Sequence, residues 1–224
     1  MTVEAGDVHI YSALVDETSP PRNDEDWSIL DAEEKARAER FLFERDRALF
    51  VRAHGLLRTT LSRYAAIAPG EWRFVTNQFG KPAIDPALLS TPVAFNLSHT
   101  RGLAACAVAR SDVGIDVETL DCRVRPLEIA ARFFSAPEVA WLHECAEGER
   151  QVRFVELWTL KEAYVKAIGT GLSQPLNSFG FTIDSNRQIH FEPPTGDTSP
   201  WQFELGQPTD RHRLAIARRR ASLS

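Results

Sequence analysis

Residues 154–171, FVELWTLKEAYVKAIGTG, decide the fold of this chain. The stretch is long enough for a helix, and two glycines lie where that helix would end. Residues four apart share a helix face, so one side presents Trp158, Glu162 and Lys166. Apolar residues lie beside this set and on the opposite side: Val155, Val165, Leu157, Leu160, Tyr164 and Ala167. A helix that is apolar on both sides is usually buried between two other layers.

Burial of this helix would place the Glu162 carboxylate in an apolar wall. A buried carboxylate is costly unless it is hydrogen-bonded, ion-paired or bound to a metal ion. The alternative is a surface helix on which Glu162 and Lys166 simply pair with each other. Taken alone, the helix supports both interpretations equally.

A second stretch, residues 113–118 (VGIDVE), favours the metal site. Its β-branched residues alternate with Asp116 and Glu118, so the two acids share one face of a strand, about 7 Å apart. Like charges held together raise each other's pKa unless a cation lies between them. The two acids alone fit an amphipathic strand with an acidic outer face. With Glu162 they make three oxygen ligands, a set that suits Mg²⁺.

The composition is that of a globular domain in a reducing compartment. The chain has 224 residues, 43% of them hydrophobic and 25% charged, which is ample for a core. A net charge of −5 argues against bulk nucleic-acid binding. Three cysteines without metal-type spacing, no apolar run of membrane length and no signal-like N-terminus predict a cytoplasmic protein.

The first half of the chain predicts a strand, helices and more strands. Apolar spacing predicts a strand over 8–14 and a long helix over 46–67. Asp31 followed by Glu34 is a capping box that opens a helix through about residue 40. The remaining segments are a loop over 18–26, a short strand over 72–76, a turn over 77–82, and strands over 93–98 and 103–109. We expect these last two strands and the acidic strand to form one antiparallel meander.

The second half repeats this order. After the acidic strand come a helix over 126–133 and one over 135–146, the latter opened by Ser135 and Glu138. Residues 148–151 are expected to link the second of these to the central helix. Four strands should follow, over 179–183, 188–191, 201–205 and 214–218.

This repetition predicts an α+β fold made of two similar lobes, residues 1–109 and 110–224. The active cleft should lie where the lobes meet. Because the join falls in an expected hairpin near residues 107–112, no flexible linker is predicted. A duplicated chain that carries its own cleft needs no second copy, so we expect a monomer.

Three further motifs could bind anions, although each also has an ordinary structural interpretation. Gly80-Lys81-Pro82 puts a cation at the tip of a turn, where most lysines are merely solvated. Asn96-Leu97-Ser98-His99 places an imidazole at a strand end, where a histidine is more often structural. Arginines crowd the first helices, as a solvated face or as phosphate ligands: Arg37, Arg40, Arg45, Arg47 and Arg52.

Five motifs in one order resemble a known family. They are FLFERD (41–46), GKP (80–82), NLSH (96–99), GIDVE (114–118) and WTLKEAYVK (158–166). This series is similar to the surfactin-type, pseudo-dimeric branch of the 4′-phosphopantetheinyl transferase superfamily, over about residues 37–172. The G-I-D-x-E and W-x-x-K-E-x-x-x-K pair at this separation is the most specific part.

The resemblance implies transfer of 4′-phosphopantetheine from coenzyme A to a serine of an apo carrier protein, releasing 3′,5′-ADP. It implies that Asp116, Glu118 and Glu162 bind Mg²⁺. Our hypothesis is that Glu162, directly or through a metal-bound water, takes the proton of the carrier serine while Lys166 steadies the leaving oxygen. With His99 these are the catalytic candidates. The implied coenzyme A contacts are Arg45, Lys81, Ser98, His99 and Lys166, with Lys81 and His99 suited to the 3′-phosphate.

Some positions are not assigned by the resemblance. Residues 47–50 lack a histidine that some relatives carry, and Lys161 is either functional or a structural ion-pair partner. Acidic carrier proteins need a basic, apolar surface, for which the candidates are Arg123, Arg125 and Arg132 beside Phe133 and Phe134. Arg218-Arg219-Arg220 is interpreted as a disordered basic tail.

Two other functions use the same residues. One is a Mg²⁺-dependent hydrolase of nucleotide pyrophosphates, which would release 3′,5′-ADP without a carrier protein. The other is a non-catalytic module that binds coenzyme A or carrier protein, against which the complete set of acids and Lys166 argues. Whether the acceptor belongs to fatty-acid, polyketide or nonribosomal-peptide synthesis is left open by the sequence.

Overall fold

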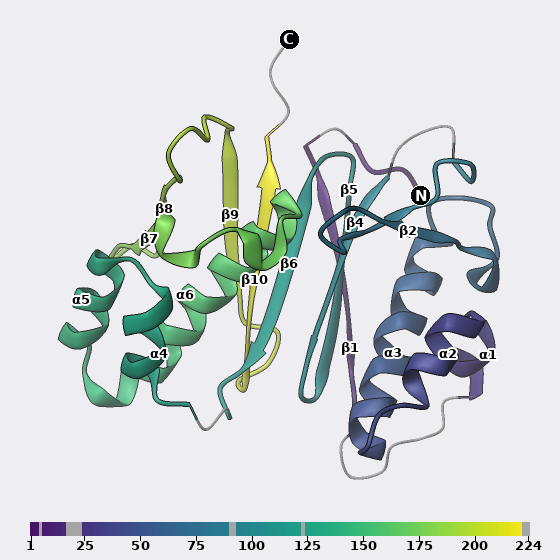
Figure 1. The fold of residues 1–224 in the computed structure, drawn as a ribbon, viewed down its shortest axis with the longest axis horizontal. Helices are drawn as coiled ribbons and strands as arrows, with labels where there is room; N and C mark the ends of the chain where they lie inside the picture. The colour runs from purple at the N-terminus through teal and green to yellow at the C-terminus, as the bar shows by residue number, and fades with distance from the viewer. Residues whose placement is uncertain (5, 17–23, 90–92, 122–123, 221–224) are drawn as a thin grey trace.

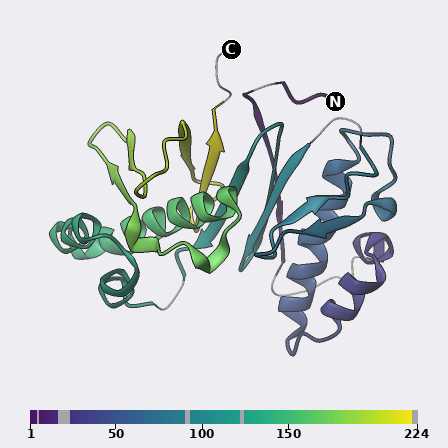
Figure 2. The same cartoon turned by 45° about the horizontal axis from the view of Figure 1, so that its top comes forward.

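The computed structural model describes residues 1–4, 6–16, 24–89, 93–121 and 124–220. It is an α+β structure in which two three-stranded antiparallel sheets lie between the helices of two lobes (Figure 1). The view turned by 45° shows the same arrangement, with α3 on one side of the pair of sheets and α6 on the other (Figure 2). Among the described residues, no helix is both long and apolar enough to cross a bilayer.

The two lobes share one topology, as the sequence predicts. In each, the first strand pairs with the last strand, which also pairs with the strand before it, giving sheet orders β1-β5-β4 and β6-β10-β9. The first lobe contains β1 (Val8–Leu14), α1 (Asp24–Ile29), α2 (Ala32–Ala38), α3 (Glu44–Leu61), a 3₁₀ turn η1 (Pro69–Glu71), β2 (Phe74–Thr76), β3 (Pro82–Ile84), β4 (Ala94–Thr100) and β5 (Leu103–Ala109). The second contains β6 (Val113–Thr119), α4 (Pro126–Phe133), α5 (Ala136–Glu144), α6 (Glu147–Ile168), η2 (Gly171–Ser173), η3 (Leu176–Ser178), β7 (Gly180–Ile183), β8 (Ile189–Glu192), β9 (Trp201–Gly206) and β10 (His212–Arg219).

Strand β5 is buried on both faces and joins the two lobes. Ala104, Cys106 and Val108 pack in one cluster with the inner residues of α3. The alternate residues of β5 pack against the second sheet in a separate cluster: Leu103, Ala105, Ala107 and Ala109 with Val113, Ile115, Val117, Leu214 and Ile216. The continuous apolar run therefore reflects a strand between a helix and a second sheet.

The central helix α6 is buried on both sides, as predicted. It packs on β6 and β10 and also contacts α4, α5 and β7. It ends at Gly169, whose φ of 71° is the left-handed conformation that favours glycine. The predicted linker over residues 148–151 is wrong, because α6 already begins at Glu147. Glu147 and Glu149 lie in its first turn, where negative charge stabilises a helix N-terminus.

The predicted meander is also wrong in its third strand. Strands β4 and β5 pair as expected, but β6 pairs with β10 from the end of the chain. Residues 110–112 therefore carry the chain from one sheet to the other. The apolar faces of β5 and β6 pack against each other in the cluster between the sheets.

Three local predictions differ from the structure. The long helix ends at Leu61 rather than near residue 67. Beyond its end, the hydroxyl of Tyr64 forms hydrogen bonds with His9 and Tyr11 of β1. The expected loop over 18–26 gives way to α1 from Asp24, and its residues 18–23 lie outside the described part of the chain. Arg218 and Arg219, expected in a disordered tail, instead belong to β10, because their backbone pairs with β9; their side chains form ion pairs with Glu204 and Asp112.

Gly114 allows α6 to lie directly against β6. A Cβ at this position would lie 2.0 Å from the carbonyl oxygen of Ala163 and 2.5 Å from the amide nitrogen of Ala167. We expect Gly114→Ala to lower the free energy of unfolding by about 1–3 kcal/mol, the usual cost of overpacking, measured by urea denaturation. Gly148→Ala is the matched control, because nothing lies within 4 Å of a Cβ there. Equal stability of Gly114→Ala and the wild type would contradict this packing.

Glu34 joins α2 to α3 through buried ionic contacts. Its carboxylate accepts hydrogen bonds from Arg58 Nε (2.8 Å) and contacts His54 Nδ1 (2.7 Å), and it also caps α2 at Asp31. Burial alone would raise its pKa, but the hydrogen bonds of His54 and Arg58 outweigh burial and lower the pKa to about 2. The charged carboxylate therefore stabilises the fold.

The pKa of Glu34 predicts a loss of stability in acid. A carboxyl whose folded pKa lies below its unfolded value stabilises the protein above about pH 4.5, and this contribution disappears as the pH falls toward 2. We expect Glu34→Gln to cost on the order of 3 kcal/mol at pH 6 and much less near pH 2. Denaturant unfolding across this pH range tests it, with exposed Glu33→Gln as the control. A pH-independent difference would contradict it.

Candidate active site

The seam between the lobes is built where β4 runs along the open edge of β6. From Asn96 onward, every second residue of β4 is polar and faces that edge. Asn96 Oδ1 accepts a hydrogen bond from the Ile115 amide (2.8 Å), and Ser98 Oγ accepts one from the Val117 amide (3.3 Å). Since β6 pairs with β10 on its other side, these side chains satisfy backbone groups that would otherwise have no partner.

Asp116 lies at the centre of this seam and is 3% exposed. Its Oδ1 accepts hydrogen bonds from Ser98 Oγ (3.0 Å) and from Lys166 Nζ (2.5 Å), and Lys166 Nζ also contacts Ser98 Oγ (3.0 Å). One serine, one carboxylate and one ammonium from three elements therefore meet at a single point. These are the predicted residues that the structure brings into direct contact.

Glu118 and Glu162 lie close enough to Asp116 for their charges to interact. Burial, followed by the charge of the Asp116 carboxylate, raises the pKa of Glu118 to about 7. A hydrogen bond from Thr100 Oγ1 (3.1 Å) acts in the opposite direction and lowers the pKa. Burial and Asp116 likewise raise the pKa of Glu162, while Lys166 lowers it. The three acids thus form one region of excess negative charge.

The donor set fits a hard divalent cation. Asp116 Oδ2 is buried and has no hydrogen-bond partner among the described residues, and the raised pKa values of the other two acids indicate missing positive charge. Carboxylate oxygens of this kind are the ligands of Mg²⁺. In the described part of the chain, however, no three acidic, histidine or cysteine side chains already form a ligand cluster. The ammonium of Lys166 instead lies on Asp116.

A pocket of about 320 Å³ opens beside these residues. Glu162 and Lys166 line it from α6, and Asn96 lines it from β4. The remaining wall is largely apolar or backbone: Phe79, Gly80, Lys81, Pro82, Leu97, Val165, Gly169 and Gly171. An apolar cavity with a few polar groups at one end is the usual form of a small-molecule site.

Two predicted ligand residues, Lys81 and Arg45, lie less centrally. Lys81 lines the pocket, but its ammonium donates to the carbonyl oxygens of Ala167 (2.7 Å) and Val113 (3.4 Å). Arg45 lies in a separate pocket with Leu49 and forms an ion pair with its neighbour Asp46 (3.5 Å). In this arrangement Lys81 adjoins the pocket beside Lys166, whereas Arg45 lies in a different pocket.

His99 faces away from Ser98, because successive residues of a strand alternate. It lies near a group of cations on the α2 and α3 side. Partial desolvation, followed by the charges of His54, Lys166 and Arg37, lowers the pKa of His99 to about 4, although its side chain is still exposed at the surface. A place where cations repel one another in this way is suited to an anion.

Lys161 has a structural position. It is fully buried, and its Nζ donates to the carbonyl oxygens of Leu176 and Phe179 and to Glu138 Oε2, each at 2.8 Å. It therefore ties α6 to α5 and to the start of β7. This decides the alternative that the sequence leaves open in favour of an ion-pair partner.

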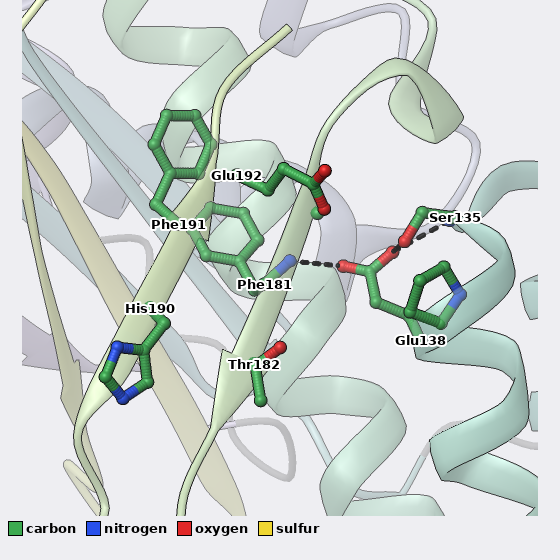
Figure 3. A pocket seen from close by; sticks show the side chains of 9 residues that line it. Ser135, Glu138, Phe181, Thr182, His190, Phe191 and Glu192 are labelled. Carbon is green, nitrogen blue, oxygen red and sulfur yellow. Dashed lines mark hydrogen bonds between the residues drawn. The ribbon is translucent and has the colours of Figure 1, made fainter.

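A second, smaller pocket of about 120 Å³ lies between α5 and the β7–β8 hairpin. Figure 3 shows the side chains that line it. Its buried polar groups bind one another, since Glu138 accepts hydrogen bonds from Ser135 (2.8 Å) and from the Phe181 amide (2.9 Å). Glu138 is also the partner of Lys161. These contacts therefore serve to hold α5, α6 and β7 of the second lobe together.

The sequence interpretation missed Thr100 and Asn77. Thr100 continues the polar alternation of Asn96 and Ser98 by one step, and that continuation was the available signal. Asn77 binds a backbone carbonyl 92 residues away, for which no local pattern exists.

Of the predicted docking residues, Arg132 lies over the exposed ring of Phe133. Arg125 pairs with Glu128, Phe134 belongs to the core, and Arg123 is outside the described residues.

Comparison with known proteins agrees with this architecture. The profile of the 4′-phosphopantetheinyl transferase superfamily matches residues 112–217, and that of a 4′-phosphopantetheinyl transferase N-terminal domain matches residues 20–111. The chain is 34% identical to the 4′-phosphopantetheinyl transferase HetI of a Nostoc species, over 78% of this chain and 73% of HetI. It is 33% identical to the 4′-phosphopantetheinyl transferase Sfp of Bacillus subtilis, over 92% of this chain and 90% of Sfp.

Among solved structures, the holo-[acyl-carrier-protein] synthase of Thermotoga maritima is 26% identical, with a TM-score of 0.41, over 49% of this chain and 62% of that one. The relatives that extend over nearly the whole chain identify the family. This chain belongs to the 4′-phosphopantetheinyl transferase superfamily.

Proposed function

We propose that this protein transfers 4′-phosphopantetheine from coenzyme A to a serine of an apo carrier protein. The observation that carries the proposal is the meeting of Ser98, Asp116 and Lys166 at the seam, with Glu118 and Glu162 beside them and a pocket adjoining. Relatives along most of the chain are named phosphopantetheinyl transferases. Coenzyme A is accordingly the co-substrate.

Asp116, Glu118 and Glu162 would hold a Mg²⁺ ion. When bound, Mg²⁺ supplies charge neutralisation for the pyrophosphate of coenzyme A. The orphaned Asp116 Oδ2 and the raised pKa of both glutamates support this assignment. The ammonium of Lys166, now on Asp116, would turn toward a phosphate once the metal ion takes its place on the carboxylate.

The transfer step assigns two roles to α6. Glu162 accepts the proton of the carrier serine, whose oxygen forms a bond to the phosphorus that carries the pantetheine arm. The bond from that phosphorus to the bridging oxygen breaks, and 3′,5′-ADP leaves with the electron pair. Lys166 lies beside the leaving oxygen and stabilises its charge. Since the protein does little covalent work, positioning supplies much of the rate.

The coenzyme A site would extend from the pocket across the seam. The apolar wall formed by Phe79, Pro82 and Val165 suits a heterocyclic base. Ser98 and Lys166 suit the pyrophosphate, and the cationic surroundings of His99 suit an anionic group such as the 3′-phosphate. Arg45 would reach the ligand only by leaving Asp46.

The carrier protein would dock on the second lobe. Arg132 and the partly exposed ring of Phe133 offer a cation beside apolar surface on α4, which complements an acidic helix. We further propose that the lobes divide between residues 109 and 110 and that the enzyme is a cytoplasmic monomer.

The test is incubation of the protein with coenzyme A, Mg²⁺ and a panel of apo carrier domains, followed by intact-mass measurement. A carrier domain that gains one phosphopantetheine group, with loss of the gain in EDTA, supports the proposal. Release of 3′,5′-ADP without any carrier would indicate a hydrolase instead. Binding of coenzyme A without turnover on any carrier would indicate a non-catalytic module.

A further inference from the structure

The turn that joins β2 to β3 reaches across the seam to the C-terminal end of α6. Asn77 Nδ2 donates to the carbonyl oxygen of Gly169 (2.9 Å), and Lys81 Nζ donates to that of Ala167 (2.7 Å). The last carbonyl groups of a helix have no partners within the helix. Two side chains of the first lobe therefore cap the central helix of the second, and we call this pair the clasp.

The turn that carries the clasp is rigid before it reaches α6. Asn77 Oδ1 accepts hydrogen bonds from the amides of Phe79 and Lys81, both at 2.9 Å. The Asn77 amide donates to the Lys81 carbonyl (3.0 Å), and the Gly80 amide donates to the Asn77 carbonyl (3.0 Å). A side chain that orders its own turn in this way holds its remaining amide donor in one direction.

The fit between the clasp and α6 is close. A Cβ on Gly169 would lie 2.7 Å from Lys81 Cδ and 3.2 Å from Asn77 Nδ2. The φ of 71° independently favours glycine at this position. Glycine is therefore favoured both by the backbone and by the approach of the other lobe.

The clasp touches both elements that carry the acidic and cationic groups of the site. Ala167 follows Lys166 directly on α6, and Lys81 Nζ also lies 3.4 Å from the carbonyl oxygen of Val113 at the start of β6, the strand of Asp116. Ser98, from the same lobe as the clasp, contacts both Asp116 and Lys166. The clasp thus holds the second-lobe groups at a set distance from β4.

We propose that Asn77 and Lys81 are positioning residues, and that Lys81 serves the reaction through α6 rather than as a direct ligand of the coenzyme A 3′-phosphate. This inference rests on the proposed transfer function. A lysine whose ammonium lies on two backbone carbonyls has few donors left for a phosphate. Asn77 is uncharged, so any loss on its removal reflects geometry.

Coenzyme A and dephospho-coenzyme A, which lacks the 3′-phosphate, separate the two roles of Lys81. Loss of the clasp should lower kcat/KM by about tenfold or more for both substrates, because small displacements of reacting groups are costly. We expect Asn77→Ala and Lys81→Met to affect both substrates equally. In the double variant, the decrease in log kcat/KM should be smaller than the sum of the decreases in the two single variants, as is usual for residues that act together. Gln78→Ala, an exposed residue in the same turn, is the control.

A loss by Lys81→Met that is confined to coenzyme A, with Asn77→Ala near the wild type, would overturn the inference. So would full activity of both variants. If Lys81→Met does not fold, Asn77→Ala decides alone, since it removes one hydrogen-bonding amide from an exposed residue.

Hydrogen exchange gives a readout that does not depend on activity. The amides of residues 165–169 should exchange faster in Asn77→Ala than in the wild type, while those in the first turns of α6 stay unchanged. Unchanged exchange at 165–169 would overturn the clasp. A wild-type protein that transfers nothing to any carrier would instead refute the proposed function and leave this measurement valid.

Discussion

Glu162→Gln is expected to lower kcat for transfer by about 10²- to 10⁴-fold, the range that a positioned general base contributes. The amide keeps the volume of the side chain but accepts no proton and carries no charge toward a cation. Glu162 lies among apolar neighbours of α6 and close to the charges of Asp116 and Lys166. Binding of coenzyme A should partly survive, because Ser98 and Lys166 remain.

Intact-mass time courses give kcat, and calorimetry with coenzyme A and Mg²⁺ gives the affinity. Glu149→Gln, in the exposed first turn of the same helix, is the matched control and should turn over normally. A Glu162→Gln enzyme with wild-type kcat would refute the role. Recovery of activity at high Mg²⁺ would assign Glu162 to cation binding alone.

Lys161→Met should lower the free energy of unfolding by about 3–5 kcal/mol, the cost of breaking one partner out of a buried ion pair. The change leaves the Glu138 carboxylate buried without its cation and two carbonyl groups without a donor. Denaturant unfolding measures the loss. Transfer per folded molecule should persist, since Lys161 contacts α5 and β7 and not the seam.

The double variant Lys161→Met with Glu138→Gln tests the mechanism of this loss. Removing both charges should restore part of the stability, because the uncompensated carboxylate is gone while the amide oxygen of Gln can still accept a hydrogen bond from either Ser135 or Phe181. Strictly additive losses would show that the pair is not coupled. Loss of transfer in folded Lys161→Met would show a direct role in the reaction.

Local pattern predicted the elements that carry the site. The alternation of residues 113–118 placed Asp116 and Glu118 on one face of β6, and the spacing of Glu162 and Lys166 placed them on one face of α6. The repeated order of strands and helices predicted two similar lobes, which share one sheet topology. These features depend on periodicity within a single element, which the sequence alone determines.

Contacts between distant elements were decided only by the tertiary structure. The sequence could not show that β6 pairs with β10, that Lys161 reaches Glu138, or that Lys81 caps a helix 86 residues away. A long side chain can reach several partners, and the edge of a sheet can pair with any strand whose apolar side chains point to the same face. Which partner it meets depends on how the apolar faces of the whole chain pack, and no local pattern encodes that choice.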